Sequence, residues 1–295
     1  MQVHFLGIGG SGASGAAAIA EAQGFEVTGC DLNPHNEFTT IFKPDQLLTG
    51  HNPDHLHCHP ERSEGSQDLK SGDSSQARND KLVDILAVTP AIFSLDPNNP
   101  ELLEAKKKNI PVITWQQFVG EYLTKNKFVI AVCGTHGKTT TTAMIAQLLE
   151  DTGMDPTVLL GAIIPKWKTN YRIGKSKYFV VEADEFNDNF LPTKADIAVV
   201  TNIEMDHPEY FKNLTAVKES FKKFLLQTKQ TVVANMTDPG VAEVMKVVMK
   251  TPHQISSGLP VRQAGRGKFE TYLDYSRNEL GINLQIPGEF NRLNA

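Results

Sequence analysis

A glycine-rich loop between an apolar strand and a helix is the feature that most restricts how this chain can fold. The apolar run Phe128–Cys133 predicts a buried strand, and residues 139–151 predict a helix. The loop that joins them, 134–139, reads GTHGKT. Backbone N–H groups of such a loop surround phosphate oxygens, while its lysine and hydroxyl group suit the terminal phosphates and Mg²⁺. We therefore predict a P-loop-type α/β ATPase domain, although Val132 stands where the full pattern has glycine.

The N-terminal segment has the same order of strand, glycine loop and helix. Residues 3–8 predict a strand, residues 13–23 a helix that ends at Gly24, and residues 25–30 a second strand. A strand, a helix and a strand within so short a stretch form a βαβ unit, which implies a parallel sheet. The fold class is therefore α/β, with a Rossmann-like parallel-sheet domain first.

The N-terminal loop carries a phosphate-binding pattern of its own. Residues 7–12 read GIGGSG and fit G-x-G-x-x-G, and Asp31 follows where a carboxylate can meet a ribose or a base edge. This loop alone leaves three alternatives open. It can bind a pyrophosphate group, it can bind NAD in an oxidoreductase, or it can be a tight turn that only packs the helix on the strand.

Two changes of composition suggest how the chain is divided. A polar segment at 124–127 predicts a domain boundary, with one domain over 1–126 and a second over 127–295. Residues 57–80 hold almost no large apolar side chain, so we predict a disordered insertion there. Further strands are expected over 83–88, 110–114, 178–182, 196–201 and 231–234, further helices over 100–108 and 214–228, and antiparallel strands over 269–274 and 282–286.

Acidic residues and a histidine follow two of the predicted strands. The strand at 178–181 leads into Glu182, the first residue of EADE, and the strand at 197–200 leads toward Asp206 and His207. Because the carboxyl ends of parallel strands meet at one edge of a sheet, three strand ends are predicted to converge on one site. Carboxylate oxygens there could hold a metal ion beside the P-loop.

Charge and cysteine content exclude several classes of protein. The net charge of −5 gives no positive field for nucleic acid, and no apolar run is long enough to span a membrane. The three cysteines, Cys30, Cys58 and Cys133, are too widely spaced for a disulfide framework. We therefore expect a cytoplasmic protein in a reducing compartment, with no nucleic acid partner and no membrane insertion.

Four of the nine histidines lie close together around a cysteine: His51, His55, His57 and His59, with Cys58. This spacing could hold a transition metal. The alternative is a solvated polar stretch, because no second cluster of cysteine and histidine in the sequence completes a tetrahedral site. His4 has no role that the sequence suggests, so packing is the default.

The motifs together resemble the Mur ligases, which are ATP-dependent amide-bond ligases of peptidoglycan precursor synthesis. The resemblance rests on GTHGKTTTT (134–142), EADE (182–185), TNIEMDH (201–207) and GEFNRLNA (288–295). Within the family, HFLGIGGSGASG (4–15), Gly50-His51 and the TPAI segment (89–92) are most similar to members that act on UDP-N-acetylmuramate. Asn187 and Phe290 depart from the residues usual in those members, which are aspartate and histidine.

The resemblance implies a role for each motif. UDP-N-acetylmuramate would be bound by Gly7, Gly9, Gly10, Ser11, Gly12, Asp31, His51, Thr89 and Ala91. ATP would be bound by Gly134, Thr135, His136, Gly137, Lys138, Thr139, Thr140, Asn291 and Asn294, and Mg²⁺ by Thr139, Glu182 and His207. Lys138, Glu182 and His207 would be the catalytic residues. Lys138→Ala is then expected to abolish ATP binding and to leave the fold intact.

The reaction implied is ligation of an amino acid, with L-alanine expected, to the muramoyl carboxylate through an acyl phosphate. Two alternatives stay open, a recycling ligase that attaches a tripeptide to UDP-N-acetylmuramate and an inactive nucleotide-binding fragment. The family also has a C-terminal ligase domain that presents the amine. We expect this domain to be missing from a chain truncated at Ala295, which would then bind nucleotides but form little amide.

Overall fold

The computed structural model describes residues 1–57 and 81–250. The chain divides into two compact units, Met1–Trp115 and Gln116–Ala295. The boundary between the units lies before the polar segment at 124–127, because the helical turns after Trp115 pack within the second unit. A Cβ added to Gly120, for example, would lie 2.5 Å from the backbone oxygen of Pro192. The predicted insertion at 57–80, apart from His57, and the predicted strands over 269–286 lie outside the described residues.

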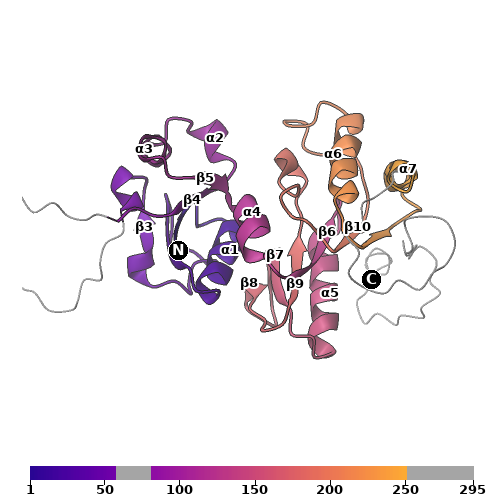
Figure 1. Ribbon diagram of the computed structural model, residues 1–295, viewed down its shortest axis with the longest axis horizontal. Helices are drawn as coiled ribbons and strands as arrows, with labels where there is room; N and C mark the ends of the chain where they lie inside the picture. Colours follow the sequence, from indigo (N-terminus) through magenta and orange to yellow (C-terminus); the bar gives the residue numbers. More distant parts are fainter. Residues whose placement is uncertain (58–80, 251–295) are drawn as a thin grey trace, which may run out of the picture. The chain divides into compact units, whose positions relative to one another are not determined.

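The first unit is built on a five-stranded sheet with the strand order β3-β2-β1-β4-β5, and all of its strand pairs are parallel (Figure 1). The strands are β1 (Gln2–Leu6), β2 (Glu26–Asp31), β3 (Leu47–Thr49), β4 (Ile85–Val88) and β5 (Val112–Thr114). The predicted Rossmann-like parallel sheet is confirmed, and β3 is a strand that the sequence did not predict. An isolated antiparallel bridge joins His57 to Leu82.

The helices of the first unit are α1 (Ser11–Ala22), α2 (Ile92–Leu95) and α3 (Pro100–Lys108), with short 3-10 turns η1 (Pro44–Gln46) and η2 (Pro53–Leu56). All the alanines of α1 except Ala22 are buried, since small side chains let the helix approach the sheet closely. Gly24 follows α1 with φ +89°, a conformation that favours glycine. A core cluster that includes Leu6, Cys30, Leu56 and Ala105 joins β1 and β2 to η2 and α3.

The second unit contains a six-stranded mixed sheet with the order β11-β10-β6-β9-β7-β8. The strands are β6 (Phe128–Cys133), β7 (Thr157–Ile164), β8 (Thr169–Arg172), β9 (Tyr178–Glu182), β10 (Ile197–Val200) and β11 (Thr231–Ala234). Only β8 runs antiparallel to its neighbour, in a hairpin with β7 that the sequence did not predict. Since β6 lies between β9 and β10, the carboxyl ends of these three parallel strands are adjacent.

The helical elements of this unit are α4 (Trp115–Phe118, which begins in the first unit), a π-helical turn η3 (Val119–Leu123), α5 (Lys138–Asp151), η4 (Phe186–Asp188), α6 (Leu214–Leu226) and α7 (Pro239–Val248). Helix α5 contacts β6, β7 and β9, and α6 contacts α7. The side chains of Asn213 and Asp238 cap α6 and α7 by accepting backbone hydrogen bonds.

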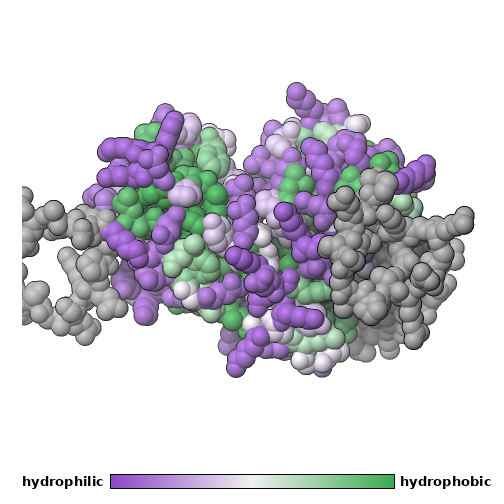
Figure 2. Space-filling model, viewed as in Figure 1, coloured by the Kyte–Doolittle hydropathy of each residue, from purple (hydrophilic) through white to green (hydrophobic). Residues whose placement is uncertain are grey.

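Hydrophilic side chains are spread over the visible face of both units (Figure 2). No helix in the part of the chain that the structure describes has the length and apolar character needed to cross a membrane.

Candidate functional site

The glycine loop of the second unit runs from the end of β6 to the start of α5. Gly134 has φ +139° and Gly137 has φ +80°, and both conformations strongly favour glycine. A Cβ on Gly134 would lie 2.0 Å from Oγ1 of Thr201, so the loop also has no room for a side chain there. Gly137 is the N-cap of α5. The loop therefore leads directly into a helix N-terminus, where backbone N–H groups favour an anion.

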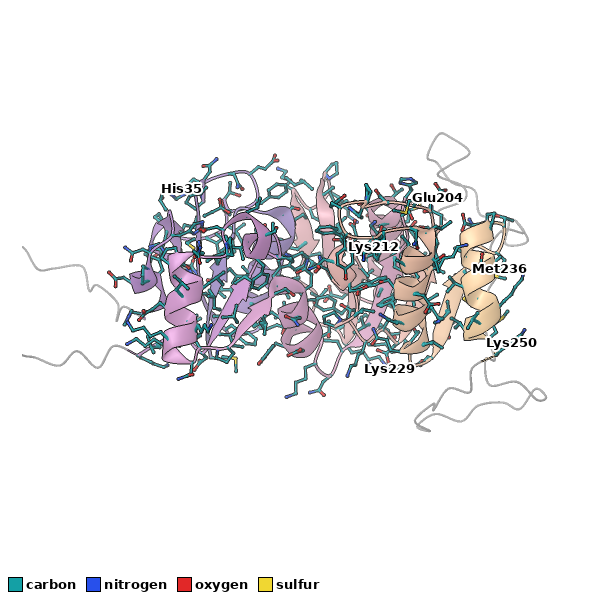
Figure 3. All side chains as sticks on the ribbon, turned by 90° about the horizontal axis from the view of Figure 1, so that it is seen from above. His35, Glu204, Lys212, Lys229, Met236 and Lys250 are labelled. Atoms are coloured by element: carbon teal, nitrogen blue, oxygen red, sulfur yellow. The ribbon has the colours of Figure 1, made fainter. Side chains whose placement is uncertain are left out.

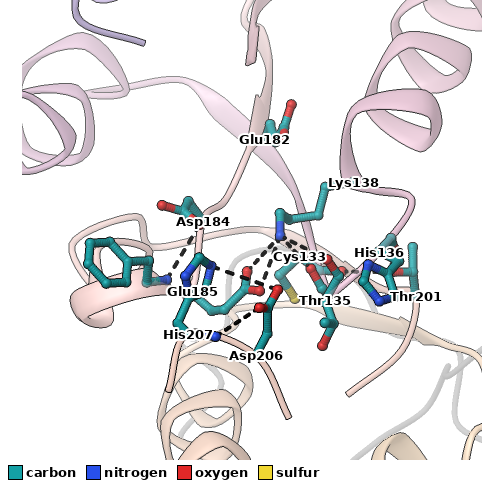
Figure 4. A network of polar contacts seen from close by, with 12 residues as sticks. Cys133, Thr135, His136, Lys138, Glu182, Asp184, Glu185, Thr201, Asp206 and His207 are labelled. Carbon is teal, nitrogen blue, oxygen red and sulfur yellow. Dashed lines mark hydrogen bonds and ion pairs between the residues drawn. The ribbon is translucent and has the colours of Figure 1, made fainter. Parts of the chain in front are cut away.

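Residues that follow β10 hold this loop through its backbone (Figure 4). The N–H of His136 donates to Oδ1 of Asn202 at 2.8 Å, and Nδ2 of Asn202 donates to the carbonyl of His136 at 3.1 Å. The hydroxyl of Thr201 donates to the same carbonyl at 2.6 Å. The N–H of Glu204, which is labelled in Figure 3, donates to Oγ1 of Thr135 at 2.9 Å. We did not predict Asn202 as a site residue, although the string TNIEMDH contains it.

Lys138 forms a buried ion pair with an acid that the sequence left without a role. Its Nζ lies 2.9 Å from Oε2 of Glu185 and donates to the carbonyl oxygen of Gly134 at 2.7 Å. The side chains are 14% and 1% exposed, respectively. Burial raises the pKa of Glu185, while the charge and hydrogen bond of Lys138 oppose that rise. The EADE string does contain this acid, but only the fold shows that its partner is Lys138.

Thr139 and Glu182, predicted as metal ligands, lie together at the start of α5 and the end of β9. The Thr139 hydroxyl donates to Oε1 of Glu182 at 2.9 Å, and the N–H of Gly161 donates to Oε2 at 2.8 Å. A pocket of about 350 Å³ opens here, lined by Thr135, His136, Gly137, Lys138, Thr139, Thr140 and Glu182. The structure thus brings all the predicted loop residues except Gly134 into one pocket with the predicted carboxylate.

His207 lies beside a second pair of acids. One donor atom from each of His207, Asp184 and Glu185 lies within 4.8 Å of the others. The backbone of His207 has φ +52°, and its Nδ1 is 3.1 Å from Oε1 of Glu209. Asn187, the departure from the family motif, has φ +54°, which asparagine tolerates better than most residues. His207 lies near Glu185, the partner of Lys138, but is not one of the residues lining the pocket.

The glycine loop of the first unit lies at the carboxyl ends of β1, β2 and β4. The N–H of Gly9 donates to Oδ2 of Asp31 at 3.1 Å. Gly7 has φ +90°, and a Cβ on it would lie 2.7 Å from Cγ2 of Thr89. Gly10 is the N-cap of α1, which begins at Ser11. Most of the residues expected to bind the nucleotide sugar are therefore neighbours at one edge of the sheet.

Three residues of that predicted set have other surroundings. The open side of Gly12 faces an indole, since a Cβ there would lie 2.3 Å from Cζ2 of Trp115. His51 follows β3 and points toward Cys30, with its Nδ1 3.5 Å from Sγ. Ala91 is exposed and is the N-cap of α2. Asn291 and Asn294 lie outside the described residues.

Two known family models match this chain, and each match includes one of its glycine loops. The Mur ligase middle domain matches residues 132–295, and the Mur ligase family catalytic domain matches residues 2–43. The chain belongs to the Mur ligase family.

Individual relatives indicate which members of the family this chain resembles. The chain is 34% identical to the UDP-N-acetylmuramate–L-alanine ligase of Aquifex aeolicus and 32% identical to that of Clostridium perfringens. Each match covers 100% of this chain and 61% of the relative, so the chain spans about three fifths of the length of these relatives.

Solved structures agree on the fold. The crystal structure of UDP-N-acetylmuramate-alanine ligase from Thermotoga maritima matches with a TM-score of 0.65 and 28% identity, over 83% of this chain and 51% of that one. A UDP-N-acetylmuramate:L-alanyl-gamma-D-glutamyl-meso-diaminopimelate ligase from Neisseria meningitides has a TM-score of 0.67 at 24% identity, over 83% of this chain and 74% of that one. The latter supports the fold alone.

Proposed function

We propose that this chain carries the nucleotide-sugar and ATP sites of a ligase that joins L-alanine to the carboxylate of UDP-N-acetylmuramate. The observation that carries the proposal is the meeting of Lys138, Thr139 and Glu182 around the glycine loop at the carboxyl ends of β6 and β9. The names of the relatives support the choice of substrates. The product would serve peptidoglycan precursor synthesis in the cytoplasm, where ATP is supplied.

The donor atoms in the pocket fit a magnesium nucleotide. The Thr139 hydroxyl and the Glu182 carboxylate are hard oxygen ligands of the kind that Mg²⁺ prefers, and they already lie 2.9 Å apart. We assign these two residues to one Mg²⁺ and His207, with Asp184 or Glu185, to a second. Bound Mg²⁺ would neutralise charge that develops on the transferred phosphoryl group. Asn291 and Asn294 remain our assignment for the adenine.

Lys138 is the residue we assign to the terminal phosphates. In the structure its ammonium group is satisfied by Glu185 and by the carbonyl of Gly134. Contact with a phosphate therefore requires the lysine to exchange some of these partners for phosphate oxygens. Before ATP binds, Glu185 would keep the ammonium group close to the loop. Lysine suits such an exchange of partners because its ammonium group is a point charge on a flexible side chain.

The proposed reaction has two steps. A carboxylate oxygen of the muramoyl group attacks the γ-phosphorus of ATP, and the bond from that phosphorus to the β,γ-bridging oxygen breaks, which gives an acyl phosphate and ADP. The amine of L-alanine then attacks the carbonyl carbon, phosphate leaves, and a proton is lost from nitrogen. Such a transfer depends on positioning and charge neutralisation, so no nucleophilic side chain is needed.

We assign UDP-N-acetylmuramate to residues 1–126 and ATP to residues 127–295. The support in the first unit is the loop 7–12, whose N–H groups precede α1, together with Asp31 and Thr89. His51 and Ala91 follow the neighbouring strands and complete the assignment. The oxidoreductase alternative has no support in the family matches, which include both glycine loops.

The test uses the 295-residue chain and separates binding from chemistry. Calorimetric titrations measure the binding of UDP-N-acetylmuramate, of NAD, and of a Mg²⁺ complex of a non-hydrolysable ATP analogue. The chain is then incubated with ATP, UDP-N-acetylmuramate and hydroxylamine, which traps an acyl phosphate as a hydroxamate. Incorporation of radiolabelled L-alanine is measured in parallel, with Glu182→Gln as the inactive control.

We expect binding of the nucleotide sugar and of the ATP analogue, and hydroxamate only when ATP, Mg²⁺ and UDP-N-acetylmuramate are all present. Binding of NAD without binding of UDP-N-acetylmuramate would overturn the assignment of the first unit. Binding of both nucleotides without any hydroxamate would instead favour the inactive nucleotide-binding fragment.

A further inference from the structure

Four metal-ligating side chains meet inside the first unit, outside the residues assigned to the reaction. They are His4 of β1, Cys30 of β2, His55 of η2 and Glu101 of α3. One donor atom from each lies within 4.8 Å of all the others. His4, Cys30 and Glu101 are fully buried, and the side chain of His55 is 14% exposed.

The parallel register of β1 and β2 explains how two of these groups come together. His4 is opposite Thr28, and Leu6 is opposite Cys30. Residues two positions apart share a face of a strand, so His4 and Cys30 lie on one face of the sheet. Helix α3 and η2 are in contact with each other and share a core cluster with this face.

Glu101 is a buried carboxylate that requires compensation for its charge. It accepts hydrogen bonds from the thiol of Cys30 at 3.1 Å and from the N–H of Asn52 at 3.1 Å, and Nδ1 of His55 is 3.0 Å away. Burial alone would raise the pKa of Glu101, but His4, His55 and Cys30 together lower it to about 2. A buried anion of this kind is stable only with a cation or strong donors beside it.

His4 is oriented as a metal-binding histidine is. Its Nδ1 lies 2.8 Å from Oγ1 of Thr28, which fixes the ring. Its Nε2 is buried, lies 3.3 Å from Oε2 of Glu101, and makes no hydrogen bond within the described part of the chain. In metal sites the second ring nitrogen of a histidine ligand is usually held in this way by an outer group.

We propose that His4, Cys30, His55 and Glu101 form a structural site for a divalent transition metal, with Zn²⁺ as the expected ion. Two nitrogens, one sulfur and one carboxylate oxygen are the ligand types of tetrahedral zinc. Zinc bond lengths give a tetrahedron with edges of about 3.3–3.8 Å. Nδ1 of His55 and Sγ of Cys30 lie 3.0 and 3.1 Å from Oε1 of Glu101, and Nε2 of His4 lies 3.3 Å from Oε2. Since the four donors all lie within 4.8 Å of one another, a shift of the side chains would bring them around one ion.

Charge balance favours the same conclusion. A thiolate and a carboxylate cancel the two charges of Zn²⁺, whereas both histidines bind as neutral rings. In the structure the Cys30 thiol donates to Oε1 of Glu101 at 3.1 Å, and a metal bound by the thiolate would take the place of that proton. His51, with Nδ1 3.5 Å from Sγ of Cys30, is positioned to donate a hydrogen bond to the thiolate from outside.

The sequence alone leaves open whether the histidine-rich stretch holds a metal, and the proposed site uses one of its histidines. His55 belongs to that stretch, and the ligands that complete a tetrahedron come from β1, β2 and α3 rather than from a second cluster. Four protein ligands leave no open position, which is typical of a structural rather than a catalytic site. The metal would therefore fasten η2 to the sheet and to α3.

The experiment uses Co²⁺ as a spectroscopic substitute for Zn²⁺ in the full chain. The protein is freed of metal with a chelator and titrated with Co²⁺ and, by competition, with Zn²⁺. A thiolate-to-cobalt charge-transfer band and the intense visible bands of tetrahedral Co²⁺ are expected at one ion per chain. Cys30→Ser and His55→Ala are the test variants, while Cys58→Ser and the exposed His35→Ala are matched controls. Circular dichroism confirms that each variant is folded.

Cys30→Ser should lose the charge-transfer band, and His55→Ala should weaken binding by more than the roughly 10–100-fold caused by loss of an outer-shell partner. Both controls should behave as the wild type. A folded wild-type chain without a thiolate band would overturn the proposal. A band that disappears in Cys58→Ser and persists in Cys30→Ser would overturn it too, because the metal would then be held by the histidine-rich stretch.

Discussion

Replacing Lys138 with alanine should do more than remove the proposed ligand of the terminal phosphates. The ammonium group is the cationic partner of Glu185, whose side chain is only 1% exposed. The sequence predicts that this variant leaves the fold intact, whereas the structure predicts a loss of stability. Removal of one member of a buried pair leaves the other charge without compensation.

The size of this loss follows from the proton that Glu185 can take up. In the variant, burial raises the pKa of Glu185 with no lysine to oppose it. The unfolded chain has an ordinary glutamate pKa of about 4.3, and each pKa unit is worth about 1.36 kcal/mol. Protonation of the buried group therefore limits the cost to about 4 kcal/mol near pH 7 and to about 2 kcal/mol near pH 5.5. The folded variant binds a proton that the unfolded chain lacks, so its stability falls as the pH rises.

Urea denaturation at these two pH values measures the effect, and Glu185→Gln is the matched variant. We expect Lys138→Ala to be less stable than the wild type, by a margin that grows from pH 5.5 to pH 7. The double variant Lys138→Ala/Glu185→Gln should recover most of the stability and should still fail to bind the ATP analogue. A Lys138→Ala chain as stable as the wild type at pH 7, or equally destabilised at both pH values, would refute the reasoning.

Two further predictions concern the first unit. Gly12→Ala should lower the free energy of unfolding by about 1–2 kcal/mol, because the clash with Trp115 outweighs the helix propensity of alanine. Gly10→Ala meets only a carbonyl oxygen at 3.6 Å, so it should be nearly neutral for stability and should weaken UDP-N-acetylmuramate binding; equal destabilisation of the two variants in urea would contradict this contrast. Replacement of residues 58–80 by a short glycine-serine linker should change stability by less than about 1 kcal/mol, since shortening a loop changes closure entropy little. Strong hydrogen-exchange protection across 60–78 would be the contrary result.

Elements with a strong local pattern could be predicted from the sequence. The strands β9 and β11 and the helix α3 have the predicted bounds, and β6 leads through the glycine loop into α5 as expected. In each case the signal is local, as an uninterrupted apolar run, a proline at the first helical position or a glycine loop.

The elements that we did not predict lack that local signal or were overlooked. Strand β3 has three residues, too few to show a pattern. The apolar run of β7 is interrupted by Gly161. The two ends of its hairpin are joined by Arg172 of β8, which donates to Asp155 at 2.7 Å, a contact that no local pattern shows. Helix α7, by contrast, begins with Asp238 and a proline, a start signal that could have been used.

In the site, too, residues that belong to a local motif could be predicted, whereas contacts between separate elements could not. Lys138, Thr139 and Glu182 follow from motifs, and the structure places them around one pocket. The partnership of Lys138 with Glu185 and the hydrogen bonds of Asn202 depend on the strand order β10-β6-β9, which differs from the order along the chain. The cluster around Glu101 depends on four separate elements, so no single stretch of sequence reveals it.

The N–H of His136 donates to Asn202, and its carbonyl accepts from Asn202 and Thr201, which has a thermodynamic consequence. A loop with free backbone groups would lose conformational entropy when it closed around phosphate, at about 1–2 kcal/mol for each residue that became fixed. In this chain the loop loses that conformational entropy during folding, because Thr201 and Asn202 after β10 already fix its backbone before any ligand binds. Nucleotide affinity then does not carry that cost, and the calorimetric entropy of binding should become less favourable when Asn202→Ala releases the loop.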